Sequence, residues 1–490
     1  MWLLQKEQQN LSPYSRRKRI EMSSLFPCNA DYLAYESPIA TNPPQWQLSL
    51  PHVAIATLAS VLFGYHMGVV NVPLQYIGKD LLFAGNAIVQ GLVVSVTLAS
   101  AFLGCALSGT IADTLGRRRA FQISCVPMIL GAIISAISTH VGAMVLGRFI
   151  VGLGLGLSSP VTSMYVSEIS PASVRGTYGS LLQIASCVGI LAALVAGLPA
   201  HSVPGWWRAC FWISTVPACL LALGMEFCAE SPRWLFKQSE WYEAEQELER
   251  LWGPSHVKGA MADLVRAEQS HDSGGTSWHA LIDPRYIKVV TIGAALFAFQ
   301  QFAGINAVFY FSSTVFQAAG VTSDVAASVS VGAVNLLASC LAAYLMDRLG
   351  RRTLMMLSFM GMAFAMAMQV LAAVVPAISS QRGSIALLGT LVYVFMFALG
   401  AGPVPGLLLP EIFPDCIRAK GMAVAMCVHW MANFVVGLMF LQLLKTLGTG
   451  ILYTFFTLVC LAAALFVKQN VVETKGQSLE EIESLLLTNL

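Results

Sequence analysis

The chain has 490 residues, of which 56% are hydrophobic and only 11% are charged, and its formal net charge is +2. Soluble globular proteins carry about 25% charged residues, so most of this surface is not built to face water. The small net charge excludes a nucleic-acid-binding protein, which needs a concentrated basic face. The scattered cysteines, with no C-x-x-C pair, predict neither a disulfide framework nor a metal site.

A polar tail, residues 1–51, opens the chain and contains a basic cluster from Arg16 to Arg19. No apolar segment precedes a cleavage site, so the tail is not a secretory signal peptide. Its serines are typical of a plastid transit peptide, whereas Glu7, Glu21 and Asp31 argue against one. A targeting role for this segment therefore stays open.

Twelve apolar runs follow, each of about twenty residues, which is the length that crosses a bilayer as a helix. Six lie in residues 52–229 and six in residues 289–468. A polar linker, residues 230–288, joins the two sets and includes a predicted surface helix from Trp241 to Trp252, and residues 469–490 form a tail. The runs start near His52, Ile88, Ala120, Val141, Thr177, Ala209, Val289, Val325, Thr353, Ile385, Gly421 and Gly448. We expect an all-α integral membrane protein with twelve transmembrane helices.

The basic residues fix the expected orientation. Most of the 28 Lys and Arg residues fall in the tails, the linker and alternate loops. The opposite side holds only Lys79, Arg208, Arg382 and Lys445. By the positive-inside rule, both tails and the linker are expected in the cytoplasm.

Three local patterns occur twice, at nearly the same shift along the chain. The pairs are Asp113, Gly116, Arg117 and Arg118 with Asp347, Gly350, Arg351 and Arg352; Glu168, Pro171 and Arg175 with Glu411, Pro414 and Arg418; and Glu230 to Arg233 with Glu473 to Gly476. A shared shift indicates that the second half repeats the first in parallel orientation. Two parallel halves with a site between them at the bilayer midplane are the architecture of major facilitator transporters.

The repeated charges lie at the cytoplasmic ends of the spans, where acids and arginines can pair while hydrated. We expect them to tie the halves together when the inner side is closed; the alternative is that they only anchor the topology. The network comprises Asp113, Arg117, Arg118, Glu168, Arg175, Glu230, Arg233, Asp347, Arg351, Arg352, Glu411 and Arg418.

With these motifs, the chain resembles the sugar porter family of major facilitator transporters over nearly its whole length after about Pro44. The segments that carry the resemblance are G-R-R-R from Gly116, G-R-F-I-V-G from Gly147, S-P-R-W from Ser231, Q-Q-F-A-G-I-N from Gln300 and E-T-K-G from Glu473. It looks closer still to the plant plastidic glucose transporter branch, through G-Y-H-M-G-V-V-N from Gly64, G-A-G-P-V-P from Gly400 and the ending from Val471. Within the branch it looks most like the member described as a Golgi hexose carrier. The resemblance implies alternating-access transport of a hexose across a plastid or Golgi membrane, by a monomer without a cofactor.

A sugar site needs neutral hydrogen-bonding amides and an aromatic face in an apolar cavity, since buried charges are costly and select ions. The spans contain such residues, and by resemblance they match the family's sugar contacts. The candidates are Gln183, Gln300, Gln301, Asn306, Asn335, Asn433 and Trp430. Hydrogen bonding between helices is the alternative role for these amides.

The resemblance also implies gates and a hinge. Asn71 and the aromatic pair Tyr310 and Phe311 are candidate gate residues on the outer side, although plain core packing is an alternative for the aromatics. Pro403 and Pro405 break helix hydrogen bonding, which predicts a hinge or a static kink in span ten. Many family members carry a tryptophan and a glutamate in this span where the present chain has Gly406 and Ala398, which leaves substrate choice and the inner gate open.

Proton-driven family members place an aspartate in span one near an arginine in span four. Here the corresponding residues are His66 and Arg148, and an imidazole beside a guanidinium tends to stay neutral. We expect facilitated diffusion, with proton coupling as the alternative because histidine titrates near neutrality. His429 is a further candidate polar contact. The competing functions are a carrier of another polyol and a sugar sensor. An enzyme is not expected, because the spans lack clustered acids, bases or metal ligands.

Overall fold

The computed structural model describes residues 45–171, 173–271, 278–321, 323–375, 381–414 and 417–475. Most of the expected targeting tail and the end of the closing tail lie outside this range. The chain divides into two compact units. One is the helical bundle, whose described residues lie in 52–167, 175–228 and 278–475, and the other gathers the described residues of the linker with those of 168–174 and 45–51.

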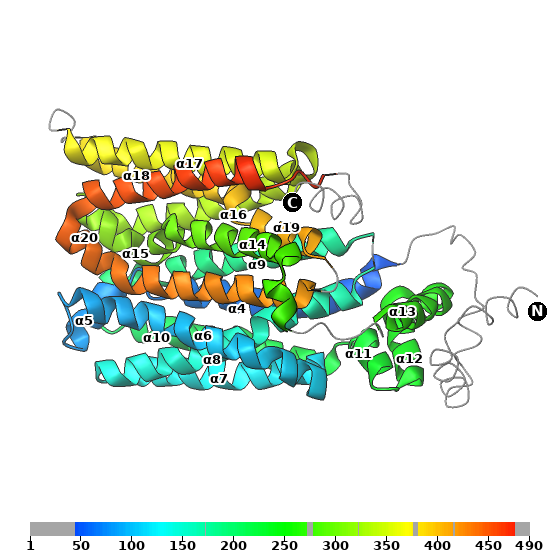
Figure 1. The fold of residues 1–490 in the computed structure, drawn as a ribbon. Helices are drawn as coiled ribbons and strands as arrows, with labels where there is room; N and C mark the ends of the chain where they lie inside the picture. The colour runs from blue at the N-terminus through cyan, green and yellow to red at the C-terminus, as the bar shows by residue number, and fades with distance from the viewer. Residues whose placement is uncertain are drawn as a thin grey trace, which may run out of the picture. The chain divides into compact units, whose positions relative to one another are not determined.

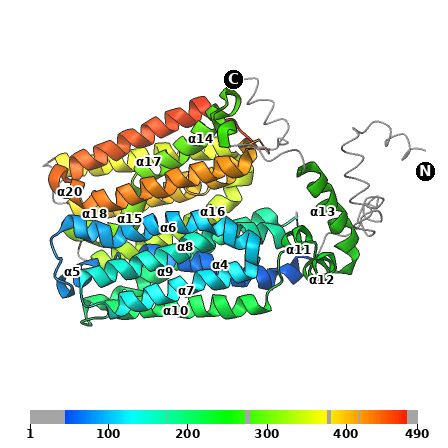
Figure 2. The ribbon, with the colours of Figure 1, turned by 60° about the horizontal axis from the view of Figure 1, so that its bottom comes forward.

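The first half of the bundle contains six long helices. They are α4 (Trp46–Gly68), α6 (Ala87–Leu115), α7 (Arg117–Ile137), α8 (Val141–Ile169), α9 (Arg175–Ala196) and α10 (Trp207–Gly224), with the short α5 (Leu74–Asp80) after α4. The helix α4 begins at Trp46, ahead of the expected start at His52. Figures 1 and 2 show the six running along a common direction.

The second half repeats this plan with interruptions. Its helices are α14 (Pro284–Phe302), α15 (Ile305–Ala318), α16 (Asp324–Leu349), α17 (Arg351–Val374), α18 (Arg382–Met396), α19 (Val404–Ile412) and α20 (Arg418–Asn470), and a π-helical turn (Phe397–Ala401) lies between α18 and α19. In both views these helices lie beside those of the first half (Figures 1 and 2).

The number of spans agrees with the sequence. Eleven helices or helix pairs of the described chain are long and apolar enough to cross a membrane. The last of them, Lys420–Asn470, is folded at Gly448, whose φ of 77° departs from the helix, so it supplies two antiparallel spans and completes the expected twelve. Two further spans are broken inside: α14 and α15 meet at Gly304, and α18 and α19 meet across the π-helical turn.

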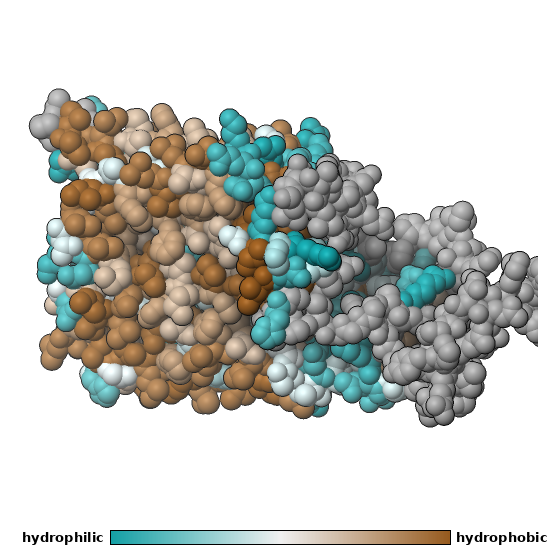
Figure 3. Space-filling view, in the orientation of Figure 1, coloured by the Kyte–Doolittle hydropathy of each residue, from teal (hydrophilic) through white to brown (hydrophobic). Residues whose placement is uncertain are grey.

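The surface of the bundle is apolar around its middle. Figure 3 shows a broad hydrophobic band with hydrophilic residues gathered toward the ends. Large apolar side chains of the spans, such as Leu107, Val126 and Phe364, are more than half exposed. An apolar surface this extensive would aggregate in water and is suited to lipid. The protein is a multi-pass integral membrane protein.

Small residues let the helices approach closely. A Cβ atom at Gly91 of α6 would lie 2.3 Å from the carbonyl oxygen of Leu438 in α20, and one at Gly64 of α4 would lie 1.9 Å from that of Ser186 in α9. The first contact joins the two halves, and the second packs the first half internally. Any larger side chain at these positions would push the backbones apart.

The linker unit contains α11 (Pro232–Lys237), α12 (Trp241–Trp252) and α13 (Val257–His271). The expected surface helix is therefore present as α12. Its apolar face, with Ala244 and Leu248, packs against Phe236 of α11 and Met261 of α13 in a small core of the linker unit itself. The acidic face of α12 explains why this segment is too polar to enter lipid.

Gly304→Ala should lower the free energy of unfolding by about 1–2 kcal/mol, because the left-handed φ of 93° disfavours an L side chain. The added Cβ would also lie 2.8 Å from the ring of Phe456. Denaturant unfolding of the detergent-solubilised protein measures this difference. Gly109→Ala is the matched control, since its Cβ would meet nothing within 4 Å. Equal unfolding midpoints for the two variants would contradict the prediction.

Candidate functional site

The candidate site begins where α14 ends. Gln300 and Gln301 occupy its last turn, and Asn306 lies in the first turn of α15. The side chain of Gln301 donates to Gln300 Oε1 at 3.1 Å, contacts His429 Nδ1 of α20 at 3.0 Å, and accepts a hydrogen bond from Asn306 through Oε1. These four side chains form one connected polar group, which we call the amide chain.

The break at Gly304 brings the members of the amide chain together. Its left-handed conformation ends α14 and restarts α15 as a separate helix. Asn306 can then turn back to Gln301, five positions earlier, which an unbroken helix would place on a different face. The carbonyl of Ala303, freed by the break, accepts a hydrogen bond of 2.7 Å from the hydroxyl of Tyr393 in α18.

Gln300 is hydrogen-bonded to the break between α18 and α19. Its amide nitrogen donates to the carbonyl oxygens of Ala401 and Gly402, at 2.7 and 2.9 Å. Its Oε1 accepts from Gln301, so both amide hydrogens and the oxygen of Gln300 are used inside the protein. The expected interruption of span ten at Pro403 and Pro405 is present, as the π-helical turn followed by α19. The expected sugar contact of Gln300 stays a prediction.

Tyr310 and Asn433 form a further polar contact next to the amide chain. The Tyr310 hydroxyl donates to Asn433 Oδ1 at 3.1 Å and lies 3.4 Å from the sulfur of Met67 in α4. Asn433 stands one turn after His429 on α20, and its amide nitrogen has no hydrogen-bond partner within the described chain. A buried amide with unused donors is a group that a hydroxylated ligand could satisfy.

Aromatic rings lie against His429 and its neighbour Trp430. Its ring centroid lies 5.0 Å from that of Phe297 and 5.4 Å from that of Trp430, and the ring of Phe63 in α4 lies 6.0 Å from Trp430. The aromatic face expected at Trp430 is therefore next to the amide chain. The sequence analysis offered His429 only as a further candidate polar contact. Its contact with Gln301, which only the folded structure shows, makes it a member of the amide chain.

The remaining two candidates form a separate pair. Gln183 of α9 and Asn335 of α16 both direct their amide nitrogens at the sulfur of Cys187, at 3.8 and 3.2 Å, and Ser339 lies 3.2 Å from the same atom. This contact joins the two halves. No hydrogen bond among the described residues connects the pair to the amide chain. The sequence analysis did not predict the place of Cys187 between two amides.

His66 and Arg148 are neighbours, as expected. Both are buried, and Arg148 donates to the main-chain carbonyl of His66 at 3.2 Å and to that of Val93 at 3.4 Å. Neither ring nitrogen of His66 has a hydrogen-bond partner in the described part of the chain. The guanidinium is thus held by carbonyl oxygens, and no carboxylate of the described residues forms an ion pair with it.

Asn71 joins the halves at the end of the bundle that carries α5. Its amide donates to the carbonyl of Phe309 at 2.6 Å and to Ser312 Oγ at 2.9 Å, and its oxygen accepts from the main-chain N–H of Ser313 at 3.1 Å. The bundle is therefore fastened at this end between α15 and the turn that joins α4 to α5. Phe311 stacks on Phe440 of α20 at 5.5 Å, so its ring packs inside the second half.

The repeat is visible in the contacts at the opposite end, which we call the basic end. Arg118 at the start of α7 donates to the carbonyl of Met225 at 3.0 Å, and Arg352 at the start of α17 donates to that of Lys468 at 2.5 Å. Each arginine therefore binds the end of the last long helix of its own half.

Ion pairs add to the basic end. Arg117 lies 3.2 Å from Asp113, and Arg351 lies 3.3 Å from Glu411. Both pairs join residues of one half and so fasten that half internally. The expectation that this network ties the two halves together stays a prediction.

The other members of the expected network are distributed over both units. Glu168 lies near the end of α8, Arg175 begins α9, Glu230 is buried before α11, Arg233 is exposed in α11, and Arg418 begins α20 and donates to the carbonyl of Phe413. The side chain of Asp347 lies outside the described residues.

The position where many relatives carry a tryptophan is open. A Cβ atom at Gly406 would meet nothing within 4 Å, whereas Ala398 is buried in the π-helical turn. The space beside Gly406 is therefore not filled by another side chain.

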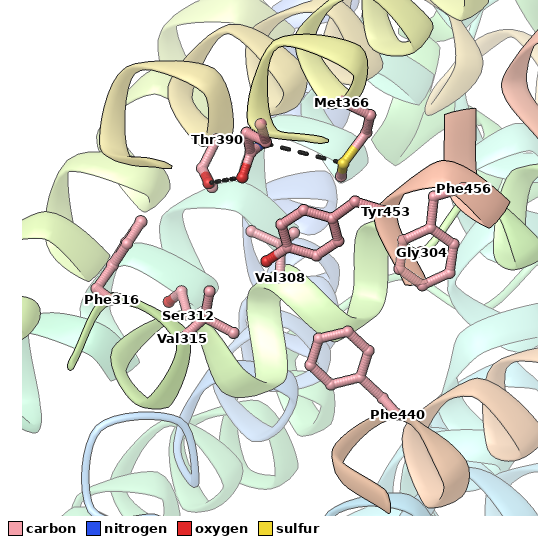
Figure 4. A pocket seen from close by; sticks show the side chains of 11 residues that line it. Gly304, Val308, Ser312, Val315, Phe316, Met366, Thr390, Phe440, Tyr453 and Phe456 are labelled. Atoms are coloured by element: carbon pink, nitrogen blue, oxygen red, sulfur yellow. Dashed lines mark hydrogen bonds between the residues drawn. The ribbon is translucent and has the colours of Figure 1, made fainter. Parts of the chain in front are cut away.

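A cavity of about 20 Å³ lies behind α15 (Figure 4). The side chains of Tyr453, Thr390 and Val308 border it (Figure 4), and Gln369 also lines it. This volume suits a water molecule, whereas ligand pockets measure roughly 300–1,000 Å³. The cavity is therefore not the site of a hexose.

Comparison with known proteins agrees with these features. Residues 52–486 match the family model described as "Sugar (and other) transporter". The chain is 57% identical to "Probable plastidic glucose transporter 2" of Arabidopsis thaliana, over 92% of each chain, and 53% identical to "Probable plastidic glucose transporter 3" of the same plant, over 91% of this chain and 90% of that one. The solved proton:xylose symporter XylE from E. coli, bound to 6-bromo-6-deoxy-D-glucose, is 30% identical and superposes with a TM-score of 0.75 over 90% of this chain and 99% of its own.

Asn71→Ala should speed hydrogen exchange at the Ser313 amide by roughly tenfold or more, because the buried N–H loses its side-chain acceptor. Mass spectrometry of the peptide that covers residues 309–313 measures the rate. Asn86→Ala is the control: Asn86 accepts only from Val89 at the start of α6, so the same peptide should exchange at the wild-type rate. An unchanged rate in Asn71→Ala would show that this contact does not close the bundle.

Proposed function

Because the chain belongs to the sugar transporter family, we propose that it carries a hexose, with glucose the first candidate, across a membrane by alternating access. The observation that carries the proposal is the amide chain with its aromatic neighbours. Neutral amides and an aromatic face bind sugar hydroxyls and the ring, and they offer nothing that selects an ion. The sugar would cross unchanged.

Gln301 is the central contact in this proposal. It holds Gln300, Asn306 and His429 at once in the present conformer. A sugar hydroxyl can replace any of these partners, because hydroxyls both donate and accept. We assign Asn433 and Trp430 to the same site, and Gln183 and Asn335 to its border between α9 and α16.

Alternating access needs a closed end and places where helices bend. In the proposed cycle the contacts of Asn71 with α15 close the end of the bundle that carries α5, and they break when that end opens. Tyr310 would move with α15, to which it belongs, and its hydrogen bond to Asn433 of α20 would change with that movement. The interruptions at Gly304 and Gly402 supply the bending points.

We further propose that both tails and the basic end face the cytoplasm, following the positive-inside rule. The names of the plastidic relatives favour a plastid envelope, and a Golgi membrane is the alternative. A monomer suffices, because both halves of the site lie in one chain.

Facilitated diffusion is the proposed mode. His66 stands beside Arg148 where proton-driven family members have an aspartate, and the described contacts of Arg148 are with carbonyl oxygens. Proton symport is the second candidate, favoured by the unpartnered ring of His66 and by the likeness to a proton:xylose symporter.

Gln301→Ala should reduce hexose transport by at least about tenfold, since one lost hydrogen bond in a buried site is worth 1–3 kcal/mol. Uptake of labelled glucose into proteoliposomes measures the change. Gln369→Ala is the matched control, a buried amide of the same half that borders the small cavity behind α15. Normal uptake by a folded Gln301→Ala protein would remove the amide chain from the site.

Glucose uptake should proceed without a pH gradient and should not acidify the lumen of the vesicles. Counterflow of labelled glucose, measured with and without a pH step, checks this expectation. Sustained accumulation against a glucose gradient, driven by the pH step alone, would establish the symport alternative in place of facilitated diffusion.

A further inference from the structure

The break between α18 and α19 is held by a serine from another helix. Ser358 of α17 donates its hydroxyl to the carbonyl of Met396 at 2.6 Å and accepts from the N–H of Ala401 at 2.8 Å. In a π-helix a carbonyl bonds the N–H five residues later, which here would join these same two groups. The hydroxyl of Ser358 therefore bridges the two backbone groups that close the π-helical turn.

Close packing keeps Ser358 in this position. A Cβ atom at Gly400 would lie 2.5 Å from the carbonyl of Leu354 and 2.8 Å from the Cβ of Ser358, so only glycine lets the π-helical turn approach α17 this closely. Ser358 is also fully buried, at 1% exposure. Water is therefore not available to replace its hydroxyl.

The first half offers a direct comparison through the repeat. Ser124 follows Gly116 in α7 at the same distance as Ser358 follows Gly350 in α17. Its hydroxyl donates to the carbonyl of Phe121 in its own helix, at 2.7 Å, and α8 runs unbroken past it. The two repeat-related serines therefore differ in their partners. Ser124 bonds a carbonyl of its own helix, whereas Ser358 bonds the break in a neighbouring span.

Gln300 links the break to the amide chain. It donates to Ala401 and Gly402 on one side and accepts from Gln301 on the other. A ligand that takes the amide hydrogen of Gln301 would weaken the bond to Gln300 and so change its hold on the break.

We propose that Ser358 is a positioning residue for transport. It holds the α18–α19 break in this conformer, and Gln300 connects the break to the proposed sugar site. Ser358 has no described contact with the amide chain, so its effect on transport acts through the break. The transport role rests on the proposed function, whereas the hold of Ser358 on the break does not.

The first test needs no substrate. In Ser358→Ala, hydrogen exchange of the peptide that covers residues 397–402 should accelerate by roughly tenfold or more, because the buried N–H of Ala401 loses its side-chain acceptor. Ser124→Ala, the repeat-related control, should leave that peptide at the wild-type rate. Equal rates in the two variants would overturn the assignment of Ser358.

The second test separates a positioning role from a general loss of folded protein. In proteoliposomes, Ser358→Ala should change the ratio of equilibrium exchange to net glucose flux by at least about fivefold, since only net flux requires the empty carrier to return. Ser124→Ala should keep the wild-type ratio. Proportional losses of both fluxes in Ser358→Ala would show a merely structural residue.

A third measurement tests the link through Gln300. Saturating glucose should change the exchange rate of the 397–402 peptide in the wild-type protein by at least about threefold, as expected when one hydrogen bond is redistributed. No change with glucose, in a protein that transports it, would overturn the link. If the wild-type protein moves no hexose, the proposed function and the transport role fall together, and the substrate-free exchange experiment still decides whether Ser358 holds the break.

Discussion

Every backbone N–H and C=O inside hydrocarbon must be hydrogen-bonded within the protein, and this constraint governs the whole bundle. Unbroken helices meet it by themselves. The second half breaks two of its spans and repairs both with side chains. The carbonyl of Ala303 at the first break takes a hydrogen bond from Tyr393 of α18, and the carbonyls of Ala401 and Gly402 at the second take theirs from Gln300 of α14.

The two repairs are reciprocal, because each broken span supplies the side chain that completes the other. Neither span can then bend without altering a hydrogen bond of its partner. The amide chain begins at one of these side chains, Gln300, so the polar groups proposed to bind sugar and those that hold the breaks form one network. The first half, in which α8 is continuous and Ser124 bonds its own helix, lacks an equivalent break in its described helices. The two broken spans that are repaired in this way therefore both lie in the second half.

Much of the fold could be predicted from the chain alone. The length of the apolar runs gave twelve spans, and the recurrence of Arg118 as Arg352 indicated two equivalent halves, which their matching contacts with Met225 and Lys468 confirm. The interruption at Pro403 was also predictable, since proline cannot donate to a helix ladder. The residue types of the candidate site were predicted in the same way, because only amides and aromatics suit a neutral hydroxylated ligand. The sequence did not predict that the amides fall into two separate groups. Gln183 and Asn335 meet at Cys187, whereas Gln301 contacts His429.

The sequence by itself determined the membrane class and the repeat, and it predicted the residue types of the candidate site, because hydrophobic length, repeated charges and residue type are properties of the chain read one position at a time. Only the tertiary structure decided which partner each polar side chain takes. Gln300 and Gln301 are adjacent and chemically identical, yet one holds a neighbouring helix and the other holds the amide chain. Their roles differ because a helix turns successive residues by about 100°, and the neighbours that each then meets come from segments far away in the chain.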